Sequence, residues 1–217
     1  MTVPAWTYSQ LEKFETCPRQ FYHVRVKKDW VEAPTDATRW GEKVHTAMEN
    51  RVLYGEALPD GMNQWESIAT KIASMKGEIK CEQKMAVDGG FQPADWGSAW
   101  SRGIADVVIT YKDTAVILDY KTGKRKPTEQ LMLYAGYAFA HYPQVQTVTT
   151  GFVWLKEKKI DKTPFHRSDV STIWLEFLPR VRKLEVAYEK DKWLARPSGL
   201  CNGWCPVKSC EFYKEKR

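Results

Sequence analysis

Two β-rich runs that are separated by only two residues constrain the fold of this chain most. Residues 101–111 and 114–121 carry apolar side chains on both faces, which is typical of strands inside a sheet that is covered on both sides. The intervening pair, Lys112 and Asp113, would form a hairpin loop and make the two runs antiparallel neighbours. The sequence therefore predicts a covered sheet with this hairpin at its centre.

Helical and alternating patterns surround the hairpin. Further strands are expected at residues 78–85 and 145–155. Ser9 and Glu12 fit a capping box for a first helix, and Pro18 would interrupt or restart that helix. The other helices are expected at about residues 38–54, 63–76, 127–141 and 169–191. The order is helices, three strands, a helix, a strand and a helix, which indicates an α/β or α+β core with helices on a mixed sheet.

Two acids and a lysine fall on one face of the central hairpin. With a two-residue loop, Asp106 lies opposite Asp119, and Lys121 points to the same side as Asp119. Two carboxylates inside a sheet repel each other unless a cation lies between them. Such a group could hold Mg²⁺ or Mn²⁺ for phosphodiester hydrolysis. The alternative is a pair of strand-end acids with a surface salt bridge.

The residues around these acids resemble the core of the PD-(D/E)XK nucleases, specifically the RecB-like branch. The core motifs are Gly-Ile-Ala-Asp-Val-Val at 103–108 and Ile-Leu-Asp-Tyr-Lys-Thr-Gly at 117–123. Residues 14–22 are similar to the N-terminal motif of that branch, 41–45 to its histidine motif, and 130–134 to its Gln-and-Tyr helix. The resemblance implies an α/β, restriction-endonuclease-like fold with a mixed central β-sheet flanked by helices.

The resemblance also implies roles for individual residues. Asp106, Asp119, the main-chain carbonyl of Tyr120 and His45 would bind the catalytic Mg²⁺ or Mn²⁺. Lys121 would serve the attacking water. Glu82 would hold a second metal or its water, or it is one polar residue on a wet strand face. The last candidates, Gln130 and Tyr134, share a helix face and would contact the substrate, with packing as the rival interpretation.

Four of the five cysteines suggest a second metal centre. Cys201, Cys205 and Cys210 are closely spaced near the C-terminus, and Cys17 lies in the N-terminal motif. Four thiolates could bind a 4Fe-4S cluster or Zn²⁺. The pattern resembles the iron-sulfur staple of AddB-type helicase-nucleases and CRISPR spacer-acquisition nucleases. It implies one nuclease domain over residues 1–217, in which the cysteine-rich segment 192–217 packs with the Cys17 region. The fifth cysteine, Cys81, is interpreted as a buried small hydrophobe.

The charge balance and the motifs favour DNA as the partner. The 217 residues carry 33 Lys and Arg against 27 Asp and Glu, a net charge of +6, which suits an anionic partner without proving one. Tryptophans beside arginines could stack bases. The DNA-binding candidates are Arg19, Arg39, Arg102, Lys124, Arg125 and Lys126.

We expect a metal-dependent deoxyribonuclease, an exonuclease acting on DNA ends or single strands in replication, recombination, repair or CRISPR adaptation. The alternatives are a nucleic-acid-binding protein with a degenerate nuclease core and a restriction-type endonuclease. No Walker A motif is present, so unwinding would need a partner such as a helicase, and a recombinase or a single-strand-binding protein is a further candidate partner. The sequence has no apolar run of membrane-spanning length and no signal-peptide pattern. A protein in the cytoplasm of a bacterium or a phage-infected host cell is therefore expected. No surface can be recognised as an interface from the sequence, so a monomer is the default expectation.

Overall fold

The chain forms two compact units. The computed structural model describes residues 3–124 and 129–215. One unit consists of Met1–Ala33 together with Glu176–Arg217, and the other, larger unit consists of Pro34–Leu175. The last long helix contributes residues to both units. The single domain over residues 1–217 stays a prediction.

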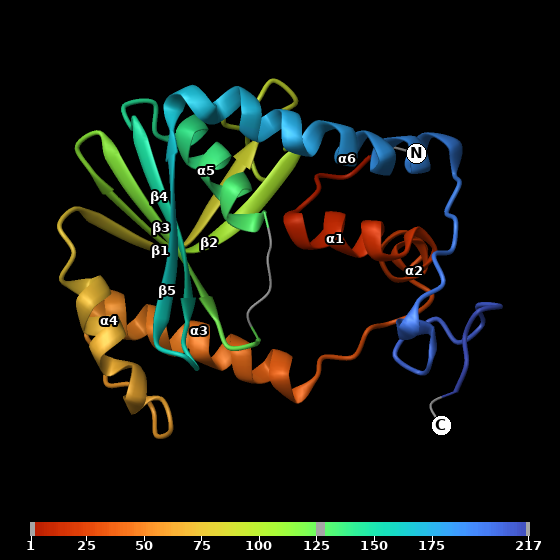
Figure 1. The fold of residues 1–217 in the computed structure, drawn as a ribbon, viewed down its shortest axis with the longest axis horizontal. Coiled ribbons are helices and arrows are strands. Elements are labelled where there is room, and N and C mark those ends of the chain that lie inside the picture. Colours follow the sequence, from red (N-terminus) through yellow and green to blue (C-terminus); the bar gives the residue numbers. More distant parts are fainter. Residues whose placement is uncertain (1–2, 125–128, 216–217) are drawn as a thin grey trace. The chain divides into compact units, whose positions relative to one another are not determined.

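The larger unit is built on a five-stranded mixed sheet in the order β1-β2-β3-β4-β5 (Figure 1). Strands β3 and β4 are parallel, and the other neighbouring pairs are antiparallel. Helix α5 (Gln130–His141) connects β3 to β4, because parallel neighbours need a crossover connection. The strands are β1 (Glu78–Val87), β2 (Ser101–Tyr111), β3 (Thr114–Lys121), β4 (Thr147–Trp154) and β5 (Lys159–His166). The predicted α/β fold with a mixed central sheet is confirmed.

The central hairpin has the predicted register. Its ladder runs from the turn to Val107, which lies opposite Leu118. One further step along the same register leads to Asp106 and Asp119. At this step the backbones of β2 and β3 no longer pair. The backbone N–H of Tyr120 donates instead to Oδ2 of the Asp106 side chain at 2.6 Å. The paired ladder therefore ends one residue before the two predicted metal ligands.

The fifth strand corrects the prediction of four. Strand β5 follows directly after a turn at residues 155–158, between the expected strand at 145–155 and the expected last helix, where the sequence indicated no regular element. The strand lies at the edge of the sheet, and most of its side chains are half-buried or exposed. It also contains Pro164, a residue that edge strands tolerate. A polar edge strand lacks the apolar signal of a buried strand, and the sequence pattern was weak for this reason.

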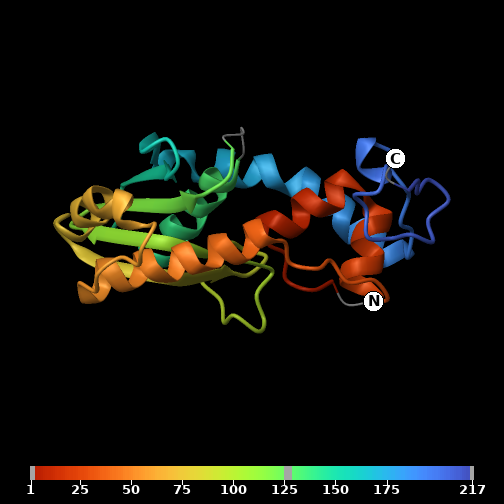
Figure 2. The same cartoon turned by 90° about the horizontal axis from the view of Figure 1, so that it is seen from below.

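Helices α3 (Asp36–Tyr54) and α4 (Glu66–Ala73) cover one face of this sheet (Figures 1 and 2). The side chain of Thr35 caps the first turn of α3, and Gly55 ends the helix with a φ of 73°. The predicted helix at 63–76 is divided into a 3₁₀ turn and the shorter α4. Apolar side chains of α3, α4, β2, β3 and β4 form one core cluster, which fixes α3 against the strands that carry the candidate site.

Helix α5 packs closely against the start of β2. A Cβ atom added at Gly103 would lie 2.8 Å from Cε1 of Tyr134 and 3.0 Å from Cε2 of Tyr137. Only a residue without a side chain allows this approach. The helix begins at Gln130 among the described residues, and the predicted start at Pro127 lies outside them.

Replacing Gly103 with alanine should therefore destabilise the protein. The new methyl group must displace one of the two tyrosine rings, and overpacking of this kind costs about 1–3 kcal/mol. Urea unfolding measures the loss of stability. The matched control is Gly97→Ala, because a Cβ at Gly97 meets no atom within 4 Å, and it should change stability by less than about 0.5 kcal/mol. Equal effects of the two substitutions would contradict the close approach of α5 to β2.

The smaller unit contains α1 (Tyr8–Thr16), α2 (Pro18–Phe21), a π-helical turn (Tyr22–Val26) and the second half of α6 (Val170–Lys190). The predicted cap of the first helix is wrong by two residues. Thr7 and Gln10 form the capping box in place of Ser9 and Glu12, because the helix begins two residues earlier than the expected cap indicated. The prediction that Pro18 restarts the helix is confirmed.

Aromatic side chains form the core of this smaller unit. Phe14 and Phe21 meet edge to face with ring centroids 5.8 Å apart, and Trp193 stacks on Phe21 at 6.0 Å. Arg180 of α6 donates two hydrogen bonds, of 2.7 and 2.8 Å, to the carboxylate of Glu15 in α1. These contacts fix α1 against the second half of α6. Among the described residues, no helix combines the length and the apolar character that crossing a membrane requires.

Candidate active site

Three potential metal ligands come together from α3, β1 and β2. One ligand atom each from His45, Glu82 and Asp106 lies within 4.8 Å of the others. The flanking pairs of the β1–β2 ladder place Glu82 opposite Asp106, but these two residues do not pair themselves. Glu82 has a φ of 47°, a left-handed conformation that is costly for a residue with a side chain. Strain of this kind is concentrated at functional sites, so this irregularity coincides with the candidate metal site.

His45 contacts two of the predicted metal ligands. Its Nδ1 lies 3.2 Å from Oδ1 of Asp106, and its Nε2 lies 3.2 Å from the main-chain carbonyl oxygen of Tyr120. Burial lowers the pKa of His45, but the hydrogen bond and the charge of Asp106 outweigh burial and raise it overall. The histidine, the aspartate and the carbonyl are thus gathered at one point, as the resemblance implied.

Asp119, Lys121 and Gln130 form a second group at the end of β3. Nζ of Lys121 lies 2.6 Å from Oδ2 of Asp119, and it also donates to Oε1 of Gln130 at 3.0 Å. Gln130 in turn donates from Nε2 to Oδ1 of Asp119 at 3.0 Å. Each member of this group contacts the other two. The group therefore holds the lysine beside the aspartate.

Tyr134 lies behind this group and supports Gln130. Its hydroxyl accepts a hydrogen bond of 3.0 Å from Nε2 of Gln130 and donates one of 2.8 Å to the carbonyl of Ile104. Burial, followed by the charge of Asp119, raises the pKa of Tyr134, so the hydroxyl keeps its proton. The structure brings Gln130 and Tyr134 to the site. Both hydrogen bonds of the Tyr134 hydroxyl go to groups within the protein. A contact of Gln130 or Tyr134 with the substrate stays a prediction.

Burial and the nearby charge of Asp106 disfavour the charged states of Asp119 and Glu82. Asp106 and Asp119 are 7% and 3% exposed. Burial, and then the charge of Asp106, raises the pKa of Asp119 to about 6. The same two causes, in the same order, raise the pKa of Glu82. Oxygen ligands that repel one another are stabilised by a divalent cation between them, so this donor set fits Mg²⁺ or Mn²⁺.

The pKa of Asp119 predicts how stability without metal depends on pH. The folded protein binds this proton more tightly than the unfolded chain, whose carboxyl has the ordinary pKa of 3.8. The wild-type protein should therefore lose stability as the pH rises through about 4 to about 6, and Asp119→Asn should lack this loss. In EDTA, the free energy of unfolding of the wild type relative to the variant should fall by about 2–3 kcal/mol. Urea unfolding at several pH values measures this, and a difference that does not change with pH would contradict the prediction.

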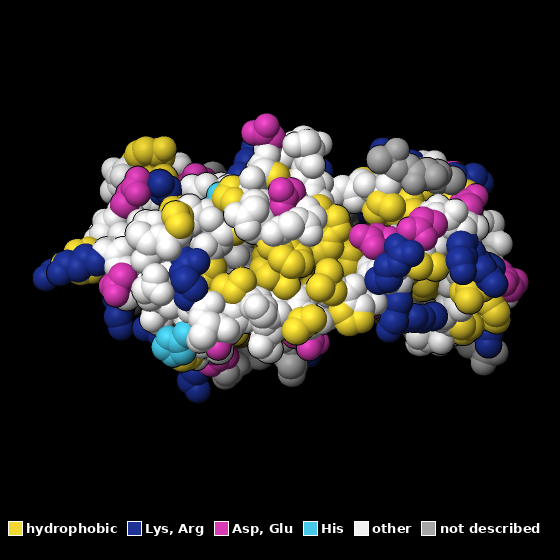
Figure 3. Space-filling view, turned by 90° about the horizontal axis from the view of Figure 1, so that it is seen from above, with side chains coloured by type: hydrophobic (Ala, Val, Ile, Leu, Met, Phe, Trp, Pro, Cys, Tyr) yellow, Lys and Arg dark blue, Asp and Glu magenta, His cyan; other side chains and the backbone are white. Residues whose placement is uncertain are grey.

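The predicted DNA contacts are distributed over several places. Arg102 lies 4.8 Å from the ring centre of Trp96 and donates to the Trp96 carbonyl at 2.6 Å. Arg39 is paired with Asp36 at 2.7 Å. In the smaller unit, Arg19 is paired with Glu211. Lys124 is exposed, and Arg125 and Lys126 lie outside the described residues. On the face shown in Figure 3, Lys and Arg side chains form several separate groups.

Lys84, which was not among the predicted DNA contacts, also lies beside Trp96. Nζ of Lys84 lies 5.6 Å from the ring centre of Trp96, the ring on which Arg102 stacks. Lys84 follows Glu82 by two residues in β1, so strand alternation could have placed both on one side. The signal was lost because Lys84 was interpreted as one of several polar residues on a wet face.

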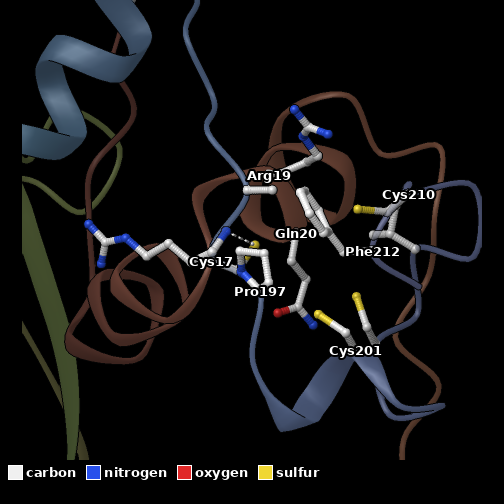
Figure 4. Close-up of a pocket in the computed structure, with 11 residues that line it drawn as sticks. Cys17, Arg19, Gln20, Pro197, Cys201, Cys210 and Phe212 are labelled. Carbon is white, nitrogen blue, oxygen red and sulfur yellow. Dashed lines mark hydrogen bonds between the residues drawn. The ribbon is translucent and has the colours of Figure 1, made fainter. Parts of the chain in front are cut away.

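The four predicted ligand cysteines line one pocket in the smaller unit (Figure 4). Figure 4 shows Cys201 and Cys210 extending from the C-terminal segment into the pocket that Cys17 lines. The backbone N–H of Arg196 donates to Sγ of Cys17 at 3.4 Å, and that of Ser198 donates to Sγ of Cys201 at 3.5 Å. Burial is the largest cause that raises the pKa of Cys205, and the other three thiols add to it. The structure thus gathers all four predicted cysteines.

Cys81 lies outside this pocket, as expected. It is half-buried, where full burial was predicted, and it packs against the core cluster of the larger unit. Burial is the main cause that raises the pKa of its thiol to about 12. Cys81 is therefore a weakly reactive side chain with a packing role.

Comparison with known proteins identifies the family. The model of the PD-(D/E)XK nuclease superfamily matches residues 5–210. The chain is a member of the PD-(D/E)XK nuclease superfamily. No curated protein matches it by sequence. Nucleases of this superfamily usually use Mg²⁺ or Mn²⁺, in agreement with the donor set described above.

Solved structures with a similar fold have little sequence identity to this PD-(D/E)XK protein. A protein from Eubacterium rectale named "Putative exonuclease" has 11% identity and a TM-score of 0.54, over 96% of this chain and 86% of that one. The crystal structure of SSO0001 has 17% identity and a TM-score of 0.48, over 99% of this chain and 90% of that one. At such identities, the Eubacterium rectale structure supports the fold alone.

Proposed function

We propose that this nuclease is a metal-dependent exonuclease that hydrolyses DNA from its ends. The observation that carries the proposal is the meeting of Asp106 with His45 and Glu82 on one side and with the Tyr120 backbone on the other. Asp119 and Lys121 flank Tyr120 in β3, and their side chains form an ion pair. The set of ligands and the lysine form one continuous site at the centre of the sheet.

The residues of this site have separable roles. A divalent metal, bound by Asp106, Asp119, His45 and the Tyr120 carbonyl, would supply a Lewis acid and lower the pKa of a water molecule. Lys121, next to Asp119 at 2.6 Å, orients that water or offsets charge that develops on the phosphate. Gln130 fixes the position of Lys121 through its 3.0 Å contact. Glu82 is placed to hold a second metal ion or its water.

The exonuclease activity and the RecB-like branch are inferred from His45 and the flanking motifs. His45 contacts Asp106 and the Tyr120 carbonyl at 3.2 Å each, so its position agrees with the histidine ligand that the resemblance implied. The name of the Eubacterium rectale structure is consistent with an exonuclease. The partner would be DNA ends or single strands, and unwinding of a duplex would need a separate helicase.

Trp96, with Arg102 and Lys84, is the best described candidate for a DNA contact. Arg102 is four residues before Asp106 on β2, which corresponds to about 13 Å along a strand. An aromatic ring with two cationic side chains beside it can stack a base while the cations attract phosphates. This group would hold the DNA strand a short distance from the bond that is cut.

For the cysteine pocket, we favour a 4Fe-4S cluster over Zn²⁺. Four thiolates can hold either centre, and all four cysteines line the same pocket. The preference for the cluster rests on the resemblance of the cysteine pattern to the iron-sulfur staple.

The proposed function is tested with end-labelled linear DNA and closed circular DNA. Protein purified with and without oxygen is incubated with each DNA in Mg²⁺, Mn²⁺ or EDTA, and its visible absorption is recorded. The expected result is metal-dependent loss of linear DNA alone, with brown protein. Discrete cuts in the circle would indicate a restriction-type endonuclease instead. Binding without cutting by folded protein in either metal would indicate a non-catalytic DNA-binding protein.

A further inference from the structure

Besides the cysteine pocket of the smaller unit, the larger unit has a pocket of its own, and none of the proposed catalytic residues lines it. It has a volume of about 460 Å³, within the range of sites that hold ligands of moderate size. Its walls come from α4, β3, β5 and the turn before β5 (Figure 1). Leu118 on its floor is adjacent in sequence to Asp119, but successive side chains of a strand point to opposite faces of the sheet. None of the proposed catalytic side chains lines this pocket.

The floor of this pocket is a continuous apolar surface across three strands. Leu118 of β3 and Ile160 of β5 are separated by β4, where Gly151 pairs with Leu118. A Cβ at Gly151 would lie 3.1 Å from Ile160 and 3.2 Å from Leu118, so the missing side chain lets these two residues approach each other. Ile68 and Met75, from α4 and the segment after it, extend the floor and are only half-buried. Apolar side chains therefore remain open to an incoming apolar group.

The rim of the pocket is basic. Lys71, Lys158 and Lys162 line it together with the apolar residues, and no acidic residue does. All three lysines are exposed. Within the part of the chain that the structure describes, none of them has an ion-pair partner. Two acids are adjacent to these lysines in sequence, Glu157 before Lys158 and Asp161 before Lys162. Asp161 accepts a hydrogen bond of 2.7 Å from Trp154, and neither acid lines the pocket. The pocket therefore combines an apolar floor with a basic rim.

This combination selects among anionic partners. A DNA backbone would satisfy the lysines but would leave the apolar floor against charged phosphate and sugar. An acidic polypeptide segment with an apolar side chain satisfies both parts of the pocket. In addition, β5 is the edge strand of the sheet, and an edge strand can pair with an extended peptide. We propose that this pocket binds an acidic, extended segment of a partner protein that inserts an apolar side chain over Leu118 and Ile160.

Fluorescence anisotropy with three labelled nine-residue peptides tests the proposal. The first peptide has aspartates around a central leucine and phenylalanine. The second has serines in place of the two apolar residues, and the third has lysines in place of the aspartates. The expected result is that the first peptide binds at least about tenfold more tightly than either of the others. Equal binding of all three, or no binding of the first, would overturn the proposal.

Variants of the full chain locate the binding. Lys71→Glu combined with Lys162→Glu should weaken binding of the first peptide at least about tenfold. The matched control, Lys76→Glu with Lys156→Glu, makes the same change in net charge at exposed lysines that do not line the pocket and should preserve binding. Ser67→Phe, at an exposed lining position, should block the pocket without removing any core residue.

Two further outcomes would decide against a peptide. Displacement of the first peptide by a single-stranded oligonucleotide, with the control variant affected as strongly as the pocket variant, would assign the site to nucleic acid. Saturable binding of an apolar carboxylate such as laurate without binding of the peptide would assign it to a small molecule. Thermal unfolding of each variant verifies that it is folded. The proposal does not depend on nuclease activity. A wild-type protein that cleaves DNA but does not bind the first peptide would refute this proposal and leave the proposed function intact.

Discussion

Asp119→Asn should abolish DNA cleavage and leave the protein folded. Asparagine keeps the shape of the side chain but removes the negative charge that would hold a divalent cation, and it ends the ion pair with Lys121. We expect a loss of about 10³-fold or more in the rate of cleavage, which corresponds to about 4 kcal/mol of transition-state stabilisation. The rate of release of labelled nucleotides from linear DNA, with saturating Mn²⁺, measures this effect.

The fold should tolerate this change because Asp119 is a poor structural residue. Its burial and the nearby charge of Asp106 raise its pKa to about 6, so the ionised carboxylate destabilises the metal-free protein at neutral pH. The melting temperature of Asp119→Asn in EDTA should therefore equal or exceed that of the wild type. Asp113→Asn, an exposed position in the loop of the same hairpin, is the matched control and should keep full activity. Equal activity of Asp119→Asn and wild type would remove Asp119 from the catalytic site.

Cys205→Ser should destroy the proposed iron-sulfur centre and destabilise the smaller unit. Cys205 is influenced by the thiols of Cys17, Cys201 and Cys210, so its loss leaves three ligands for a centre that needs four. Metal ligation contributes to folding free energy directly, and we expect the melting temperature to fall by about 10 °C. Anaerobic purification, visible absorption and iron and sulfide analysis measure the centre, and calorimetry measures the stability.

Cys81→Ser is the matched control for this substitution. Cys81 packs against the core of the larger unit and does not line the cysteine pocket, so its variant should retain the brown colour and the full iron content. A Cys205→Ser protein with wild-type iron content would exclude the cluster. Zinc in place of iron in the anaerobic wild-type protein would assign the pocket to zinc.

The sequence predicted the centre of the fold well because burial is strongly encoded there. The hairpin of β2 and β3 could be located to the residue, since both runs are apolar on both faces and a two-residue loop fixes their register. From that register, the placement of Asp106 across from Asp119 was predicted without further information. The edge strand β5 was missed, because a strand that buries little surface has a composition that resembles a loop.

Local patterns were less informative about the ends of helices. The first helix is capped by Thr7 where Ser9 was expected, because two hydroxyl residues stood close together and only the tertiary packing of Tyr8 and Leu11 decided between them. The left-handed conformation of Glu82 was also not predictable. An acid on a strand carries no local sign of such strain, which the surrounding contacts impose.

By itself, the sequence determined the mixed sheet and the hairpin with its two aspartates, because these depend on the burial of continuous apolar strands. It also supplied the motifs by which the superfamily was named. Only the tertiary structure decided that His45 contacts Asp106 and the Tyr120 carbonyl, and that four cysteines from both ends of the chain line one pocket. The same holds for the basic, apolar pocket between α4 and β5. Each of these depends on contacts between residues far apart in the chain, and spacing along a sequence does not encode distances of that kind.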